Sequence, residues 1–439
     1  MNILHYFLGF PPYRSGGLTR FAVDLMATQY EEGNLIMALW PGKIIKIGGI
    51  PRIQEREKHN GIVNYELINP LPVPLDEGIK DFKAYTMPCD IWIYQSFLEK
   101  IRPDVIHIHT LMGIHNEFIQ AANKLKIRTV FTSHDYFGLC PKVTFYRYGQ
   151  CCDNDHGCRD CIQCNLSALS LRKIQILQSH LYRALKNSGI IRMLRRIHRS
   201  KFFDEEILPQ MPEEDIEENS IKYQNLRSYY VNMLESIDLI HFNSTVAQNV
   251  YLRFITPKNS SVVSITHRKI KAHKLKREKN HEKKVILYLA AVKPYKGFNI
   301  LKNALDQLWI EGRKDFELRV FSAVKTPAPY MVIRDKGFTQ EELEDIMLEA
   351  DVLVAPSIWY ETFGFTVLEA MSYGIPVIVS DHVGAKDIVG RNGIVVKAGD
   401  VDELKEAIVN INQIDGKTDI KEWTTFMKEN YSLYKNQEN

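Results

Sequence analysis

Short apolar runs alternate with amphipathic helical segments through both halves of this chain, and this alternation limits its fold more than any other feature. Apolar runs of strand type lie at residues 3–8, 35–40, 105–109, 129–132, 285–291, 318–321, 351–355 and 376–380. Apolar residues at helical spacing follow the first run at 18–31 and a later run at 298–308. Strands that alternate with helices in this way are typical of parallel sheets covered by helices. The pattern therefore predicts an α/β fold with a doubly wound parallel sheet in each half.

The chain has enough material for two domains. It contains 439 residues, of which 45% are hydrophobic, whereas single hydrophobic cores stop growing at about 250–300 residues. A charged, polar stretch at 269–284 separates two apolar regions. We therefore expect an N-terminal Rossmann-like domain at 1–268, with a Cys-rich and helical insertion at about 140–235. A linker at 269–284 and a C-terminal Rossmann-like domain at 285–439 would follow.

The segment PSIWYETFGFTVLEAMSYGIPVIVSD, residues 356–381, has the pattern of a loop, a helix and a buried strand. Gly364 lets the backbone approach a ligand closely, and the amides of Phe365 and Thr366 carry the positive end of the helix dipole. Glu361 in the loop and Glu369 one turn into the helix are acceptors for sugar hydroxyls. The alternative is an ordinary acid-rich helix start, since acids complement the dipole there. The segment alone favours neither interpretation.

A Gly-Gly pair stands between the first expected strand and its helix, in PPYRSGGLTRF at residues 11–21. Gly16 and Gly17 leave bare backbone amides where the helix begins, which suits contact with an anion at a strand's carboxyl end. Pairs of this kind also form plain tight turns. The pair alone is therefore a weak indication of a phosphate site.

Three histidines follow or end expected strands of the first half. His134, in TSHDYFGLCPK, lies where it can donate a hydrogen bond to a sugar hydroxyl, with Asp135 to orient it. A loop histidine satisfied by backbone groups is the alternative. His107 and His109 alternate in VIHIHT, and we expect them to be structural or acceptor-side residues.

These segments together resemble a known family. The stretch 356–381, with its Glu-x7-Glu spacing followed by EAMSYGIPVIVSD, is similar to the donor-binding signature of the family 4 retaining glycosyltransferases, which have the GT-B fold. The resemblance implies two Rossmann-like domains that face a central cleft and bind a nucleotide diphosphate sugar. It implies catalytic roles for His134 and Glu361. It implies donor-binding roles for Gly16, Gly17, Lys296, Phe365, Thr366 and Glu369.

The chain departs from the family pattern in AAVKPYKGFNIL, residues 290–301. Lys296 and Gly297 match the family's Lys-Gly pair, but Ala291 stands where the family has an arginine. Arginine binds phosphate through two parallel hydrogen bonds, whereas a lysine supplies only a point charge. We consider Lys293 or Arg268 as substitutes.

Six of the seven cysteines, Cys140 to Cys164, fall within 25 residues, and three of them form a Cys-x2-Cys-x2-Cys run. Such spacing can place thiolates on zinc or an iron–sulfur cluster. The alternative is a reduced loop without metal beside the cleft. Asp153 and Asp155 resemble the Asp-x-Asp metal site of GT-A transferases, but the sequence around them lacks that context.

Residues 165–201 carry nine Lys or Arg and no acid, and eight acids follow at 204–218. A basic amphipathic segment can lie on an anionic membrane, where a lipid-linked acceptor would be found. The alternative is that the basic helices pair with the acidic segment or are solvated.

The formal net charge of +3 argues against a nucleic-acid partner. No apolar run reaches the roughly eighteen residues of a spanning helix, and the N-terminus lacks the basic flank of a signal peptide. We therefore expect a cytoplasmic location, at the inner face of the plasma membrane if 165–201 binds lipid.

The sequence thus predicts a retaining glycosyltransferase of the hexosyltransferase type. It would move a sugar from a nucleotide diphosphate sugar to a hydroxyl of a glycan or lipid-linked acceptor, in envelope or capsular polysaccharide synthesis. We expect no cofactor and no metal at the site, because helix-terminal amides and Lys296 would take the part of a divalent ion. Two alternatives stay open: a nucleotide-sugar-binding pseudoenzyme, suggested by Ala291, and a GT-B sugar-nucleotide epimerase. The donor base, the sugar and the acceptor are also left open.

Overall fold

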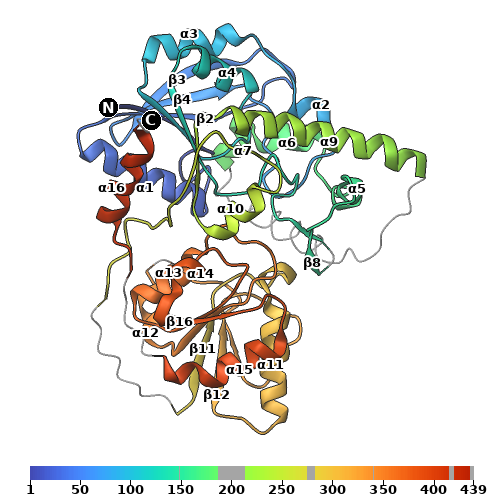
Figure 1. Ribbon diagram of the computed structural model, residues 1–439, viewed down its shortest axis with the longest axis vertical. Helices are drawn as coiled ribbons and strands as arrows, with labels where there is room; N and C mark the ends of the chain where they lie inside the picture. The colour runs from blue at the N-terminus through green and yellow to red at the C-terminus, as the bar shows by residue number, and fades with distance from the viewer. Residues whose placement is uncertain (148, 186–212, 274–281, 340, 415–419, 436–439) are drawn as a thin grey trace.

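Two sheets, each flanked by helices, form two domains that meet along one side (Figure 1). The computed structural model describes all residues except 148, 186–212, 274–281, 340, 415–419 and 436–439. The expected α/β fold with two parallel-sheet domains is confirmed. Because the side chains of the central strands are buried on both faces of each sheet, each sheet must be covered on both sides.

The N-terminal sheet has eight strands in the order β10-β9-β6-β5-β1-β2-β4-β3. Its strands are β1 (Asn2–Tyr6), β2 (Leu35–Pro41), β3 (Arg52–His59), β4 (Ile62–Ile68), β5 (Val105–Ile108), β6 (Arg128–Thr132), β9 (Leu239–Phe242) and β10 (Ser260–Val262). Neighbouring strands are parallel except at the edge, where β3 and β4 form an antiparallel hairpin. The chain order reverses between β1 and β5, so the loops after these two strands flank a crevice.

Most helices of this domain lie in the connections between its strands. They are α1 (Gly17–Glu31), α2 (Phe82–Tyr85), α3 (Ile91–Ile101), α4 (Asn116–Lys124), α5 (Arg159–Cys164), α6 (Leu171–Leu177), α7 (His180–Leu185), α9 (Glu213–Ser236) and α10 (Thr245–Tyr251). The insertion after β6 also contains a small hairpin of β7 (Tyr146–Arg147) and β8 (Gln150–Cys151). Among the helices that the structure describes, none is both long and apolar enough to cross a membrane.

The C-terminal sheet has six parallel strands in the order β13-β12-β11-β14-β15-β16. Numbered from β11, this is the order 3-2-1-4-5-6, whose switch point lies between β11 and β14. The strands are β11 (Lys284–Tyr288), β12 (Phe316–Val320), β13 (Met331–Ile333), β14 (Val352–Ala355), β15 (Val377–Ser380) and β16 (Gly393–Val396). The helices are η1 (Pro294–Lys296), α11 (Phe298–Ile310), α12 (Leu343–Leu348), α13 (Phe365–Ser372), α14 (Lys386–Val389), η2 (Gly390–Asn392), α15 (Val401–Asn410) and η3 (Ile411–Gln413).

The last helix, α16 (Trp423–Tyr434), returns to the N-terminal domain and lies beside α1 (Figure 1). Leu433 and Tyr434 join the core cluster that contains Ile3 of β1, and the Trp423 indole donates to Thr28 Oγ1 at 2.9 Å. We expected the whole of 285–439 to belong to the second domain, and this return was not anticipated. The apolar pattern of α16 shows that one face is buried, but it does not show against which domain.

The two glycines that flank α11 allow a test of the close contact between Gly297, which follows η1, and the Pro356 carbonyl. Both have positive φ, +74° at Gly297 and +91° at Gly312, so alanine is strained at either position by about 1–2 kcal/mol. A Cβ at Gly297 would lie 1.7 Å from the Pro356 carbonyl oxygen, whereas a Cβ at Gly312 meets no atom within 4 Å. We expect Gly297→Ala to lower the free energy of unfolding by about 1–3 kcal/mol more than Gly312→Ala, measured by urea denaturation. Equal losses would contradict this close approach.

Candidate functional site

A cavity of about 710 Å³ lies between the two domains, at the loops that follow the carboxyl ends of their strands. The loops after β1, β6 and β9 form one wall, and the loop and helix after β14 form the other. The lining residues are Pro11, Ser15, Gly16, Gly17, Leu18, Thr19, Arg20, Val23, Asp24, His134, Asn243, Ile265, Trp359, Glu361, Thr362, Phe363, Gly364, Phe365, Thr366 and Glu369. Ligands of open α/β sheets bind at this edge, so the cavity is the candidate site.

The structure brings seven of the eight predicted site residues to this cavity. The eighth, Lys296, lies behind one of them and contacts its carboxylate. The two walls touch: a Cβ built on Gly17 would lie 3.3 Å from the Phe365 ring. Gly364, with φ of +106°, begins α13 without a side-chain cap, so the first amides of this helix are left for a ligand. The ligand-binding roles of these residues stay predictions.

Glu361 and Lys296 form an ion pair at the edge of the cavity. Lys296 Nζ donates to Glu361 Oε1 at 2.8 Å, and Ser357 Oγ donates to Oε2 at 2.8 Å. The two side chains are 19% and 21% exposed for the lysine and the glutamate. Burial acts to raise the pKa of Glu361, but the Lys296 charge and the hydrogen bonds from Lys296 and Ser357 outweigh it, so this pKa lies below its ordinary value. The carboxylate is therefore ionised at neutral pH.

Glu369 is held by two residues of the N-terminal half. Arg20 Nη1 donates to Glu369 Oε1 at 3.1 Å, and His267 Nε2 lies 3.3 Å from the same oxygen. The Glu369 side chain is only 11% exposed. Sequence reasoning missed Arg20, although a basic residue one turn after Gly16 was a usable signal. This ion pair ties α1 to α13 across the cavity.

Arg20 is also relevant to position 291, where this chain has Ala291 in place of the arginine expected from the family pattern. Of the two substitutes considered, neither lines the cavity in the described part of the chain. Lys293 Nζ lies 5.2 Å from the ring centroid of a neighbouring tyrosine, and Arg268 forms two hydrogen bonds with Glu31, at 2.7 and 2.9 Å. The guanidinium that does line the cavity comes from the opposite domain.

His134 reaches the cavity with its ring against other rings. Its ring centroid lies 4.9 Å from that of Phe21, and its Nε2 lies 3.3 Å from His109 Nδ1. Asp135, expected to orient the ring, instead accepts hydrogen bonds from the Phe137 amide at 2.8 Å and the Thr110 hydroxyl at 3.5 Å. The group that orients His134 is therefore His109, which lies in the second expected histidine motif.

Hydrogen bonds also join the two domains beside the cavity. Ser244 Oγ donates to the Thr362 carbonyl at 2.6 Å, and Thr362 Oγ1 donates to the His134 carbonyl at 3.1 Å. Thr245 donates through its amide and hydroxyl to Asp387, both at 2.6 Å. These bonds fix the two walls relative to each other.

The Cys-rich loop packs beside the cleft. Cys151 Sγ donates to the Ile358 carbonyl at 3.0 Å, and Asp153 accepts from Tyr360 Oη at 2.6 Å and Arg253 at 2.7 Å. This pairing occupies the first acid of the Asp-x-Asp sequence. The loop therefore contributes to the junction between the domains.

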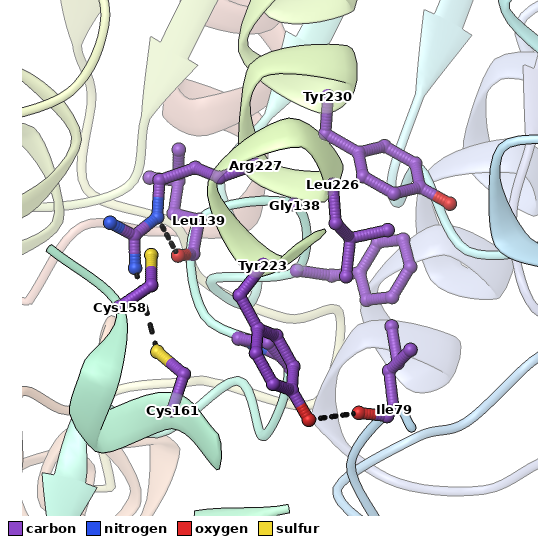
Figure 2. Close-up of a pocket in the computed structure, with 11 residues that line it drawn as sticks. Ile79, Gly138, Leu139, Cys158, Cys161, Tyr223, Leu226, Arg227 and Tyr230 are labelled. Carbon is purple, nitrogen blue, oxygen red and sulfur yellow. Dashed lines mark hydrogen bonds between the residues drawn. The ribbon is translucent and has the colours of Figure 1, made fainter. Parts of the chain in front are cut away.

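Two cysteines of the Cys-x2-Cys-x2-Cys run lie next to Arg227 of α9 (Figure 2). Among the described residues, ligand atoms of Asp155, Cys158 and Cys161 lie within 4.8 Å of one another, and Cys164 is not in this group. Asp155 is ion-paired with Arg227, whose Nη2 lies 3.9 Å from Cys161 Sγ. A hydrogen bond from Cys161 lowers the pKa of Cys158. A guanidinium thus holds the carboxylate of this group, and both interpretations of the cysteine run, with metal and without, stay predictions.

The comparisons with known proteins agree with this geometry. Residues 283–413 match the family described as Glycosyl transferases group 1. The O-antigen chain mannosyltransferase B of Escherichia coli is 30% identical over 146 residues, which are 30% of this chain and 38% of that protein. The chain spans about a third of the length of the curated relatives that it matches.

Solved structures resemble the whole chain. Sucrose-phosphate synthase from Thermosynechococcus elongatus superposes with a TM-score of 0.57 at 15% identity, over 98% of each chain. The Anabaena protein HepE, in complex with UDP and glucose, has a TM-score of 0.52 at 14% identity, also over 98% of each chain. At this identity the likeness concerns the fold. The chain thus has the GT-B fold, and its residues 283–413 match the family described as Glycosyl transferases group 1.

Proposed function

We propose that this chain is a retaining glycosyltransferase that uses a nucleotide diphosphate sugar as donor. One observation carries the proposal: a single cavity at the switch points of both sheets combines helix-terminal amides with two ion-paired carboxylates, Glu369 paired with Arg20 of the lining and Glu361 paired with Lys296 behind it. The amides near Gly17 and Phe365, with Lys296 and Arg20, would neutralise the diphosphate. Glu369 would accept hydrogen bonds from the ribose.

The protein's part in the reaction would be positioning and charge stabilisation. Glu361, kept ionised by Lys296, would hold the hydroxyls of the transferred sugar. His134 would contact the same sugar from the opposite wall. The acceptor hydroxyl would attack from the face that the phosphate leaves, and the departing phosphate would take its proton, so the configuration is retained. No protein nucleophile is needed.

The acceptor class is proposed from the relatives. The E. coli relative is named for the O-antigen chain, which favours a glycan or lipid-linked acceptor in envelope or capsular polysaccharide synthesis. The HepE structure holds UDP and glucose in the same fold, which favours a nucleotide sugar as donor. We propose both by analogy, together with a cytoplasmic location.

A thermal-shift titration with uridine and guanosine diphosphate sugars tests the proposal. At a hundredfold excess over Kd, the right donor should stabilise the chain by about 2.7 kcal/mol. Glu369→Gln should weaken that donor at least about tenfold, since a neutral amide loses a charge-assisted hydrogen bond. Glu349→Gln, which removes an acid paired with Arg319 outside the cavity, should leave donor affinity unchanged. If none of the nucleotides stabilises the protein, the proposal fails.

Product analysis separates the transferase from its two rivals. A pseudoenzyme, which Ala291 suggests, would bind the donor without turnover. An epimerase would convert the donor sugar without any acceptor. A transferase should release nucleoside diphosphate and form a glycoside only when an acceptor hydroxyl is present.

The Glu361–Lys296 pair predicts how stability depends on pH. Because the folded pKa of Glu361 is lowered, its stabilising contribution is complete at neutral pH and is lost only as pH falls through that folded pKa. In Lys296→Met, the effect of burial is no longer opposed by the Lys296 charge and raises the pKa of Glu361, so the variant should be destabilised at neutral pH and should regain stability as pH falls and the carboxyl is protonated. Melting temperatures between pH 4 and 7 measure the difference. Lys302→Met, which removes a partner of Asp306 on α11, is the control and should keep the wild-type profile. The same profile for both variants would refute the assignment.

We also propose peripheral membrane contact through 165–201, of which 186–201 lie outside the described residues. Ile176 on α6 and Leu181 on α7 are 62% and 69% exposed, close to Arg172 and Lys173 in the chain. The double variant Ile176→Asp/Leu181→Asp should bind vesicles containing phosphatidylglycerol at least about tenfold more weakly in co-sedimentation, since two apolar anchors are lost. Ile310→Asp, at an 84% exposed position of the other domain, is the control. Unchanged binding of the double variant would remove the membrane proposal.

A further inference from the structure

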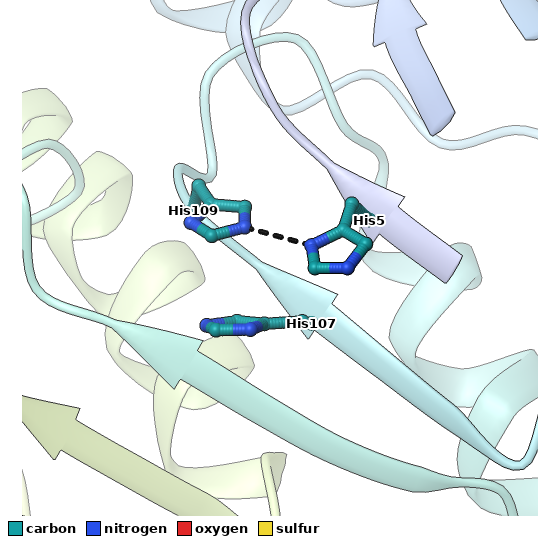
Figure 3. Close-up of side chains that lie close together, drawn as sticks. All are labelled: His5, His107 and His109. Atoms are coloured by element: carbon teal, nitrogen blue, oxygen red, sulfur yellow. Dashed lines mark hydrogen bonds between the residues drawn. The ribbon is translucent and has the colours of Figure 1, made fainter. Parts of the chain in front are cut away.

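Five histidines gather at the N-terminal wall of the cavity, where one of them, His134, lines it and the other four lie behind it. His5 on β1 faces His107 on β5 in the parallel register, and His109 follows at the end of β5 (Figure 3). His134 lies in the loop after β6, and His241 lies in β9. His5, His107, His109 and His241 are fully buried. Buried polar groups must find partners, so the hydrogen bonds of this cluster can be followed from end to end.

His5, His107 and His109 lie close enough to suggest a metal site. Every ring nitrogen of the three, however, already has a hydrogen-bond partner within the protein. The bonds are His5 Nδ1 to His109 Nε2, His5 Nε2 to Gln29, His107 Nδ1 to Tyr434, His107 Nε2 to Thr132 and His109 Nδ1 to His134, at 2.7–3.3 Å. The arrangement is therefore a hydrogen-bonded chain.

The donor and acceptor roles along this hydrogen-bonded chain are fixed at one end. The Val263 carbonyl can only accept, so His241 Nε2, at 2.8 Å, carries a proton and donates it. In a neutral ring His241 Nδ1 is then an acceptor, and it takes the hydroxyl hydrogen of Thr132 at 2.9 Å. The Thr132 oxygen must in turn accept from His107 Nε2 at 2.7 Å. His107 Nδ1 is thus left as an acceptor.

The chain then passes through the returning helix α16. Tyr434 donates its only hydroxyl hydrogen to His107 Nδ1 at 2.7 Å, so its oxygen accepts from the Gln29 amide nitrogen at 3.0 Å. This sets the orientation of the Gln29 amide and turns its oxygen toward His5. His5 Nε2 therefore donates to Gln29 Oε1 at 2.8 Å.

The last two bonds lead into the cavity. With its proton on Nε2, His5 accepts at Nδ1 from His109 Nε2 at 3.0 Å. His109 then accepts at Nδ1 from His134 Nε2 at 3.3 Å. The rings are neutral, because burial lowers the pKa of His5 and His241 to about 4 and of His134 to about 3, and holds those of His107 and His109 well below the ordinary value.

We propose that this chain of hydrogen bonds, from the Val263 carbonyl through Tyr434 and Gln29, holds His134 as the Nε2–H tautomer. The Nδ1 lone pair is then the ring group left for a ligand, and a lone pair can only accept. His134 would therefore bind a hydroxyl group that donates to it, where the sequence suggested a donor histidine. Tyr434 and Gln29 are positioning residues that act through the other imidazoles. The ligand part of this inference rests on the proposed function, whereas the tautomer does not.

Nuclear magnetic resonance of full-length protein labelled with ¹³C and ¹⁵N in its 14 histidines tests the tautomer directly. The ring ¹⁵N and ¹³Cδ2 shifts distinguish the two neutral forms, and His134→Gln and His134→Asn assign the signals of His134. The wild type should show His134 in the Nε2–H form alone. An Nδ1–H form or an imidazolium at neutral pH would overturn the proposal.

Two tyrosines on α16 supply a matched pair of variants. Tyr434→Phe removes the hydroxyl that links His107 to Gln29, so His134 should shift to a mixture of both tautomers, while His241, anchored by the Val263 carbonyl, keeps its form. Tyr431→Phe removes a hydroxyl bonded to Glu32 and Asn34, outside the chain, and should change neither histidine. If His134 keeps the Nε2–H form alone in both variants, the chain of hydrogen bonds does not set its tautomer. A protein that bound no sugar nucleotide would refute the proposed function without changing these spectra.

Discussion

The site depends on the parallel pairing of strands in both sheets. Because the strands run in one direction, the loops at their carboxyl ends gather along a single edge, and each chain order reverses at one point there. Gly16, His134 and Glu361 are far apart in sequence, yet each follows a buried strand and therefore reaches the same cavity. An antiparallel arrangement would have sent alternate loops to the opposite edge.

The electrostatics of the cavity follow from this convergence. Both carboxylates already have a cation, Glu361 with Lys296 and Glu369 with Arg20, so neither is buried as an unpaired charge. A diphosphate would compete for the same two cations. If the phosphate oxygens drew these cations away from the carboxylates, the carboxylate lone pairs would become available to sugar hydroxyls. A ligand that carries both a diphosphate and a sugar would therefore bind better than a sugar or a phosphate alone.

Sequence reasoning located the parts that rest on local pattern. The buried strands and the apolar face of α11 were found because their periodicity is unbroken, with Phe298, Leu301 and Leu305 all buried as expected. The β3–β4 hairpin was missed because residues 52–59 are mostly charged and only half-covered at the sheet edge. Arg20 and His109 could not be given their partners, because those contacts arise only when distant segments fold together.

The return of α16 shows why the domain boundary matters for the chemistry of the site. From sequence, Tyr434 is one apolar residue near the end of an amphipathic helix, with no sign of a polar role. In the fold its hydroxyl completes a buried chain that otherwise consists of histidines, Thr132 and Gln29. Removing that single oxygen would leave the buried His107 Nδ1 without its partner, at a cost of about 1–3 kcal/mol, whereas the Gln29 amide nitrogen would keep its bond to Asn430 Oδ1 at 3.4 Å. The segment that closes the C-terminal half therefore stabilises the N-terminal sheet and specifies the hydrogen-bonding state of a residue in the cavity.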